Sequence, residues 1–205
     1  MAQAFRVDHR LPSILLHNYL RGANERVSRG ELSAAQAEYR SATSIQPADF
    51  LAVDGYGRTL VEQGDLAGAL EVYVRGRAAH PLDPRLHASV GALQLRLGRP
   101  AEAYGSLKVA VQLDPRQGEA WMALGDALRE LRRLPEAEAA YRQGLPAAPE
   151  PALLFNKLGI VLALQGRAAE AEGAFRQALG LQPGFSEAAT NLERLRPTLI
   201  PTGTR

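Results

Sequence analysis

Cysteine is absent from the 205 residues of this chain, which excludes disulfides, thiolate nucleophiles and cysteine-based zinc sites. Aromatic residues make up only 6% of the chain, although 46% of it is hydrophobic and much of that share is alanine. This composition favours closely packed helices over strands, which prefer β-branched and aromatic residues. The most apolar run, residues 159–164, is far too short to span a bilayer.

A strong excess of one charge is also missing. The chain has 24 basic and 22 acidic residues, a formal net charge of +2, and no run of Lys and Arg with interleaved aromatic residues. Nucleic-acid binding is therefore not expected. The first residues lack the basic start and apolar core of a secretory signal. We expect a soluble, cytoplasmic chain without direct membrane insertion, or a periplasmic or lipid-anchored one if a signal segment precedes it.

A ladder of prolines repeats along the chain with a step of 34 residues. Its members are Pro47, Pro81, Pro115, Pro149 and Pro183. Three other places in the same register hold only alanine or glycine: Ala23, Gly57, Gly91, Gly125 and Gly159; Ala35, Ala69, Ala103, Ala137 and Ala171; Ala42, Gly76, Ala110, Gly144 and Ala178. A fourth holds large residues: Tyr39, Tyr73, Leu107, Tyr141 and Phe175. A period of this length predicts an array of similar structural units.

The ladder has a direct physical interpretation. Small residues at fixed places let two helices approach closely, and the large ring fills the space beside them. Gly30, Gly64, Gly98 and Gly166 stand where the first helix of each unit should end, because glycine adopts a positive φ at little cost. Arg132 replaces glycine in the fourth unit. The ladder prolines should end each second helix.

These residues resemble the tetratricopeptide repeat (TPR) family, whose pattern is W-x₂-L-G-x₂-Y, A-x₃-F and P. The fourth unit matches the pattern most fully, with Trp121, Leu124, Gly125, Leu128, Ala137, Tyr141 and Pro149. Its departures, Leu128 for Tyr and Tyr141 for Phe, are mild. The resemblance implies an all-α fold, a right-handed superhelical solenoid of antiparallel helix pairs. We expect Trp121 to lie in the core.

The register divides the chain into a single solenoid over residues 13–196, with irregular segments before and after it at 1–12 and 197–205. Within the solenoid we expect repeats over 16–49, 50–83, 84–117, 118–151 and 152–185, then a cap helix over 186–196. Glu193 stands where the repeats place a small residue, and a buried unpaired carboxylate would be costly. No further helix should therefore pack on the cap, and Pro197 should end it.

A binding groove is implied by the family resemblance, because the first helix of each TPR unit lines the concave face. The expected groove residues are Arg21, Asn24, Asp54, Arg58, Arg85, Ser89, Met122, Asp126, Leu153, Asn156, Lys157, Ile160 and Leu164. The last repeat carries the apolar end of this groove. There Leu153, Ile160 and Leu164 share one helical face. They could be core beneath the cap, a pocket for a partner's apolar side chain, or a dock for the chain's own residues 199–200.

The groove does not carry a known peptide-binding signature. The carboxylate clamp of chaperone-binding TPR proteins needs Lys, Asn and Arg at set places, and only Asn24 and Arg85 fit. If Arg21, Arg58 and Arg85 form a stripe, an acidic stretch of a partner would be favoured.

Signs of catalysis are missing too. The histidines show no metal-ligand spacing, there is no glycine-rich phosphate loop, and no serine lies in a nucleophile elbow. Carboxylates such as Asp126 and Glu130 lie on helix faces among arginines, where solvated pairing is the ordinary explanation. We therefore expect no catalytic residue, no metal and no cofactor, and we do not expect an enzyme.

The function expected from this sequence is an interaction scaffold or adaptor that binds a peptide or helix of a partner protein in the groove. Such a scaffold could belong to a bacterial assembly or secretion complex, for example in pilus assembly. Two alternatives remain: a self-associating structural protein whose groove accepts residues 1–12 of a neighbour, and the interaction domain of a larger enzyme such as a glycosyl- or sulfotransferase. Homo-oligomerisation is compatible with each.

Overall fold

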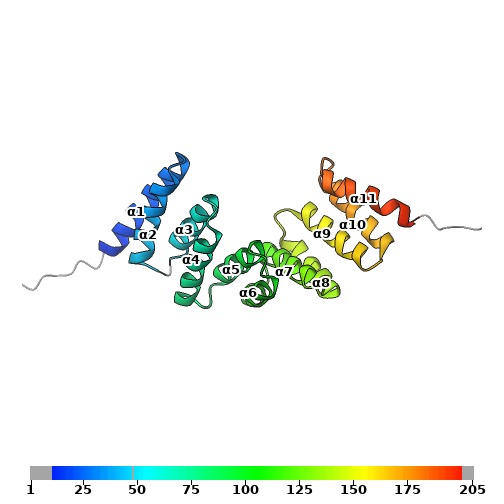
Figure 1. Ribbon diagram of the computed structural model, residues 1–205, viewed down its shortest axis with the longest axis horizontal. Helices are drawn as coiled ribbons and strands as arrows, with labels where there is room; N and C mark the ends of the chain where they lie inside the picture. The colour runs from blue at the N-terminus through cyan, green and yellow to red at the C-terminus, as the bar shows by residue number, and fades with distance from the viewer. Residues whose placement is uncertain (1–10, 48, 200–205) are drawn as a thin grey trace, which may run out of the picture. The chain divides into compact units, whose positions relative to one another are not determined.

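The computed structural model describes residues 11–47 and 49–199, with side chains as far as Leu195 (Figure 1). Helices form throughout this part of the chain, and it contains no strand, so the predicted all-α class is confirmed. The helices are α1 (Leu11–Ser28), α2 (Leu32–Ile45), α3 (Phe50–Glu62), α4 (Leu66–Ala79), α5 (Pro84–Arg96), α6 (Pro100–Leu113), α7 (Gly118–Glu130), α8 (Leu134–Gly144), the 3₁₀ turn η1 (Leu145–Ala147), α9 (Pro151–Leu164), α10 (Ala168–Leu181) and α11 (Ser186–Leu199).

The chain divides into two compact units, and the division falls within the sequence of α5. The first unit ends at Leu93 and the second begins at Gln94. In the first, α1 packs on α2 and α3 packs on α4, while α2 also contacts α3. In the second, α7 packs on α8, α9 on α10, and α11 on α10. Each of these pairs joins two neighbouring helices through a short turn (Figure 1).

The small residues of the ladder are the closest contact points between paired helices. Ala35, Ala69, Ala103, Ala137 and Ala171 are all fully buried. A Cβ atom added to Gly57 would lie 2.2 Å from the Tyr73 ring, and one added to Gly125 would lie 2.3 Å from the Tyr141 ring. The expectation that a large ring fills the space beside a missing side chain is therefore met, and these glycines set the spacing of the helices.

The turn after each first helix uses a left-handed residue. Gly30, Gly64, Gly98 and Gly166 have φ values of 75°, 84°, 70° and 76°. In the fourth repeat the same place is held by Arg132 with φ 62°, the one non-glycine residue with a positive φ in the described part of the chain. An L-residue with a Cβ is strained in this region by roughly 1–2 kcal/mol.

Helix ends differ from the sequence expectation at three places. α1 begins at Leu11, two residues before the expected start of the solenoid at residue 13. α8 ends at Gly144 and is followed directly by the 3₁₀ turn η1. The α-helix cannot continue because Pro146 has no N–H to donate the next helical hydrogen bond. The cap helix α11 runs to Leu199 and does not end at Pro197. The hydrogen bond that Pro197 cannot make would have gone to the carbonyl of exposed Glu193, which water can reach.

Trp121 was expected in the core, and that expectation is wrong. The ring is only half-buried, and its Nε1–H donates to the carbonyl oxygen of Pro115 at 2.8 Å. His87 holds the same place one repeat earlier and contacts the carbonyl oxygen of Pro81 through Nε2, also at 2.8 Å. Both rings therefore tie the first helix of a repeat to the ladder proline before it. The polar end of an aromatic ring needs such a partner.

We predict that Gly125→Ala destabilises the second unit. The new methyl group would lie 2.3 Å from a fully buried tyrosine ring that cannot move aside, and such overpacking costs about 1–3 kcal/mol. The matched control is Gly105→Ala in α6, where an added Cβ meets no atom within 4 Å. That change should stabilise by about 0.5–1 kcal/mol, since alanine is the better helix former. Urea unfolding followed by circular dichroism measures both, and equal effects would contradict the packing role of Gly125.

We predict that Arg132→Gly stabilises the chain, by about 0.5–1 kcal/mol, because it removes the left-handed strain. The reciprocal change, Gly166→Arg, should destabilise by about 1–2 kcal/mol, since an added Cβ meets no atom within 4 Å and only the backbone conformation is at stake. Thermal unfolding of the three proteins tests this: the midpoint should rise for the first variant and fall for the second. A lower midpoint for Arg132→Gly would show that the arginine side chain itself contributes.

Candidate functional site

A hollow of about 260 Å³ lies on the first-helix face of repeats one and two. Three of the predicted groove residues, Asn24, Asp54 and Arg58, line it together with Leu20 and Leu51. The wall is therefore part apolar and part charged. Leu51 is 66% exposed, although α3 also carries core residues. Because it borders the hollow, its side chain offers an apolar contact there to another molecule.

A second hollow of about 300 Å³ adjoins the first, because Leu51 lines both. Its other walls include Asp49, Phe50 and Arg85. The guanidinium of Arg85 lies 3.8 Å from the centroid of the Phe50 ring, and its Nη2 lies 2.7 Å from Asp83 Oδ2. The two hollows give the first unit one continuous polar and apolar surface around Leu51.

The three arginines expected to form a stripe are placed in different ways. Arg21 is exposed and lines neither hollow. Arg58 has its closest carboxylate partner, Asp54, at 3.8 Å, and its side chain is 72% exposed. Arg85 is held against Phe50 and Asp83, so its charge is already paired. Arg58 lines the first hollow and is 72% exposed, whereas Arg85 lines the second, is 55% exposed and has its charge paired at close range.

Tyrosine hydroxyls hold the polar residues of the groove from beneath. The Tyr39 hydroxyl donates to Asn24 Oδ1 at 2.6 Å, and the Tyr73 hydroxyl donates to Asp54 Oδ1 at 2.8 Å. Burial raises the pKa of Tyr73 above its usual range, the Asp54 carboxylate raises it further, and a hydrogen bond from Ser89 opposes the increase. The phenols stay protonated and therefore fix the orientation of Asn24 and Asp54.

The second unit pairs its predicted groove residues with one another. Lys157 Nζ lies 2.9 Å from Asp126 Oδ1, and the Tyr141 hydroxyl donates to the same oxygen at 2.7 Å. This cluster joins α7 to α9, and its charges are balanced. Met122 on α7 is half-buried. Asp126 and Lys157 therefore hold repeats four and five together and offer little unpaired charge to a partner.

The cap helix α11 covers part of the apolar end of the predicted groove. Asn156 is fully buried: it donates to Glu187 Oε1 and accepts from Asn191 Nδ2, each at 3.0 Å. Its prediction as a partner-binding residue is thus corrected, because α11 occupies the position of a partner. Leu153 and Ile160 are half-buried, whereas Leu164 is 47% exposed. The face is not wholly core beneath the cap, because Leu164 stays exposed. A pocket for a partner's apolar side chain stays a prediction, and the dock for residues 199–200 lies outside the residues whose side chains are described.

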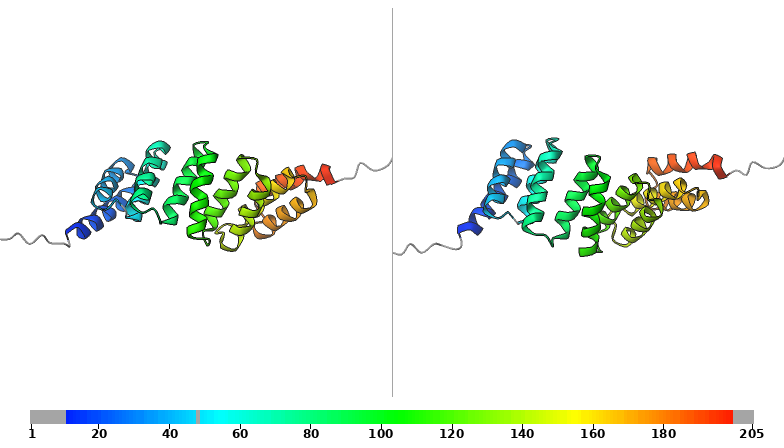
Figure 2. Two further views of the ribbon diagram at one scale, coloured as in Figure 1. Left: turned by 90° about the horizontal axis from the view of Figure 1, so that it is seen from below. Right: turned by 60° about the horizontal axis from the view of Figure 1, so that its bottom comes forward.

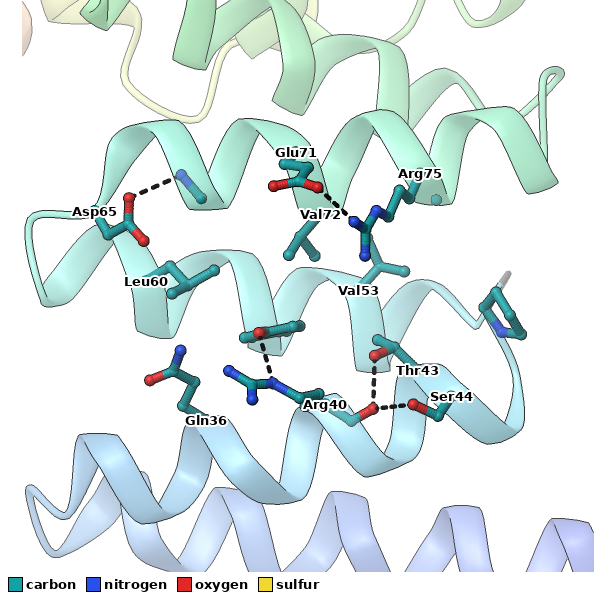
Figure 3. Close-up of a pocket in the computed structure, with 14 residues that line it drawn as sticks. Gln36, Arg40, Thr43, Ser44, Val53, Leu60, Asp65, Glu71, Val72 and Arg75 are labelled. Carbon is teal, nitrogen blue, oxygen red and sulfur yellow. Dashed lines mark hydrogen bonds and ion pairs between the residues drawn. The ribbon is translucent and has the colours of Figure 1, made fainter.

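A third cleft was not foreseen from the sequence. It has a volume of about 500 Å³ and lies on the second-helix face between α2 and α4, over α3 (Figure 3). Val53, Leu60 and Val72 form its floor, with Arg40 on the α2 side and Arg75 on the α4 side. The signal that could have revealed it is in repeat two, where Asp65 and Gly68 replace the Arg and Glu that the later repeats have at these places.

Between residues 11 and 199, no group of three or more His, Asp or Glu side chains is arranged to hold a metal ion. No helix in the same part of the chain combines the length and the apolar character that crossing a membrane requires.

Comparison with known proteins agrees with the repeat architecture. A family model described as tetratricopeptide repeat matches residues 20–84, 56–118, 91–152 and 122–184. The chain is 29% identical over 98 residues to the small glutamine-rich tetratricopeptide repeat-containing protein 2 of Mycosarcoma maydis, a match that covers 48% of this chain and 28% of that protein. This chain thus corresponds to less than a third of that relative's length.

Solved structures give the same fold. YrrB, a TPR protein with an unusual peptide-binding site, superposes with a TM-score of 0.71 at 24% identity, over 85% of this chain and 90% of YrrB. The pilF protein of Pseudomonas aeruginosa superposes with a TM-score of 0.70 at 17% identity, over 91% of this chain and 94% of pilF. At these identities the likeness is one of fold.

The overlapping family matches extend from residue 20 to residue 184, well over half of the chain, so this chain belongs to the tetratricopeptide repeat family. The predicted family is confirmed. Its members are scaffolds suited to protein interaction and are generally not catalytic, and stacked repeats of this kind present extended faces for binding.

We predict that the buried tyrosines make stability fall in alkaline solution. Burial, and then the Asp126 carboxylate, raise the pKa of Tyr141 above its usual range. Below about pH 10 the folded and the unfolded chain both keep the phenolic proton, so the free energy of unfolding is not reduced. Above about pH 10 only the unfolded chain loses the proton, and the free energy of unfolding falls by about 1.4 kcal/mol per pH unit. In urea titrations at pH 9.5 and 10.5, Tyr141→Phe should show the smaller loss. Equal losses would contradict this assignment.

Proposed function

We propose that this chain is an adaptor that binds a peptide or helical segment of a partner protein on the first-helix face of repeats one and two. The observation that carries the proposal is Leu51, an exposed leucine that borders two adjoining hollows. An apolar side chain of the partner would contact Leu51 and Leu20 there. Burial of a few such anchors supplies most of the affinity in peptide recognition.

Charge would set the orientation of the segment. Arg58 is the exposed cation of this hollow, whereas Asp54 is held by Tyr73. A carboxylate of the partner next to its apolar anchor would pair with Arg58, and charge complementarity of this kind fixes register more than affinity. The expected stripe of arginines is reduced in this proposal to Arg58, because Arg85 already has partners.

The finer setting we propose is a multi-protein assembly or secretion complex, of the kind in which pilus assembly proteins act. The fold likeness to the pilF protein supports this part of the proposal. No observation favours the transferase alternative over an adaptor.

The test begins with affinity capture from the source organism, followed by isothermal titration calorimetry with peptides that tile the captured protein. We predict that Leu51→Asp weakens the binding peptide about tenfold or more, since it replaces an apolar anchor with a charge. Arg58→Glu should weaken an acidic peptide and leave a neutral one unchanged. Circular dichroism would verify that each variant is folded.

The matched control is Leu164→Asp, which alters a similarly exposed leucine on the first helix of repeat five. It should leave the affinity unchanged. If Leu51→Asp binds as tightly as the unaltered chain, or if Leu164→Asp is the variant that loses binding, the partner does not bind around Leu51.

A further inference from the structure

The first helix carries an extra turn that no other repeat has. α1 comprises 18 residues, whereas α3, α5 and α7 comprise 13 each. The extra residues come before the repeat register begins, at places that later repeats use for the turn between helices. In both views of Figure 2 the start of α1, in dark blue, projects away from the neighbouring helices of its unit.

This turn exposes three apolar side chains on one side of the helix. Leu11, Ile14 and Leu15 are 52%, 51% and 45% exposed, and their spacing of three and four residues places them together. We call them the α1 knob. Residues 11–15 include no charged side chain. An exposed apolar group of this kind marks a surface that another molecule covers.

The cleft between α2 and α4 is the matching concave surface of the same unit. Figure 3 shows Val53, Leu60 and Val72 between a row of polar side chains from α2 and another from α4. The charges of its rim balance, since it contains two arginines and two carboxylates: Arg40, Arg75, Asp65 and Glu71. An uncharged apolar knob could enter this cleft without stranding a net charge away from water.

The cleft is open because repeat two lacks the bridge that closes the equivalent place in the second unit. There, Arg167 Nη1 lies 2.6 Å from Glu138 on the preceding second helix, and the Arg133 guanidinium lies 4.4 Å from the centroid of the Tyr104 ring. Each of these contacts ties the turn of one repeat to the second helix of the repeat before it.

In the first unit the residues at the same two places are Asp65 and Gln36. The Asp65 side chain instead accepts a hydrogen bond from the backbone N–H of Gly68 at 2.8 Å, and so caps α4. The later repeats have Glu at the place of Gly68, so repeat two also lacks this side chain on the rim of its cleft. The departures at these three places leave the rim of the cleft without a bridge. Val53 and Leu60 at its base are only 1% and 4% exposed, so the half-buried Val72 and Tyr56 provide the apolar surface that another molecule can reach.

The α1 knob of a chain cannot enter that chain's own cleft. α1 packs along α2 and contributes no residue to the cleft, and a continuous helix does not bend its first turn around its neighbour. A second copy of the chain can supply the knob.

We propose that the chain self-associates head to tail, with the α1 knob of one copy seated in the α2–α4 cleft of the next. The knob and the cleft are different surfaces, so each copy keeps one of each free and further copies can add. This contact uses the second-helix face and leaves the Leu51 hollow open, so it goes beyond the adaptor function and does not depend on it.

The test is sedimentation velocity over a concentration series. For the unaltered chain the average mass should rise with concentration above the 22.1 kDa monomer. The knob variant, Ile14→Asp with Leu15→Asp, changes exposed residues near a helix start, where aspartate is well tolerated. The cleft variant, Gln36→Glu with Asp65→Arg and Gly68→Glu, copies the residues that close the junction between repeats four and five. Each variant alone should be monomeric.

Mixing the two variants gives the decisive result. The knob variant keeps an intact cleft and the cleft variant an intact knob, so the mixture should form dimers and stop there. Leu164→Asp, which alters an exposed leucine far along the sequence, should associate as the unaltered chain does. The proposal is overturned if the unaltered chain stays monomeric at every concentration, if either variant still associates, or if the mixture stays monomeric.

Discussion

The contact between an aromatic ring and a glycine is the constraint on which the pairs α3–α4, α7–α8 and α9–α10 depend. The Tyr73 ring occupies the space that a Cβ atom at Gly57 would need. Tyr141 and Gly125 form the same contact two repeats later. Because the ring passes through this gap, its hydroxyl reaches the first-helix face, where it binds Asp54 in one case and Asp126 in the other. One packing contact thus sets the helix spacing and also the position of polar groove residues.

The 34-residue register was enough to predict the helix pairs, the left-handed turns and the buried alanines, because each of these follows from local size and backbone preference. It could not predict contacts that depend on a particular partner. Asn156 was assigned to the groove by its position, yet Glu187 and Asn191 of the cap helix bind it. Trp121 was assigned to the core by its size, yet its N–H binds the carbonyl of Pro115 at the edge.

For the candidate site too, the sequence predicted the location better than the contacts of each side chain. Its location on the first helices followed from the family, but whether each side chain was free depended on its neighbours. Asp126 and Lys157 neutralise each other, and Arg85 is bound to Asp83, so the charge available near Leu51 is smaller than the sequence suggested. The cleft between α2 and α4 arises from what repeat two lacks, Arg at position 65 and Glu at position 68, and such a departure has meaning only once the later repeats show what those residues do.

The hydrogen bonds that Asn156 makes with Glu187 and Asn191 limit how this array of repeats can lengthen by duplication. Asn156 is fully buried because the next helix offers it a carboxylate and an amide. In a duplicated copy of repeat five, the residues at those places would be the counterparts of Leu153 and Lys157. Leucine could not bind the buried amide, and a buried amide without partners costs a few kcal/mol. Duplication directly after repeat five is therefore disfavoured, because repeat five and the cap helix α11 depend on each other through this buried amide.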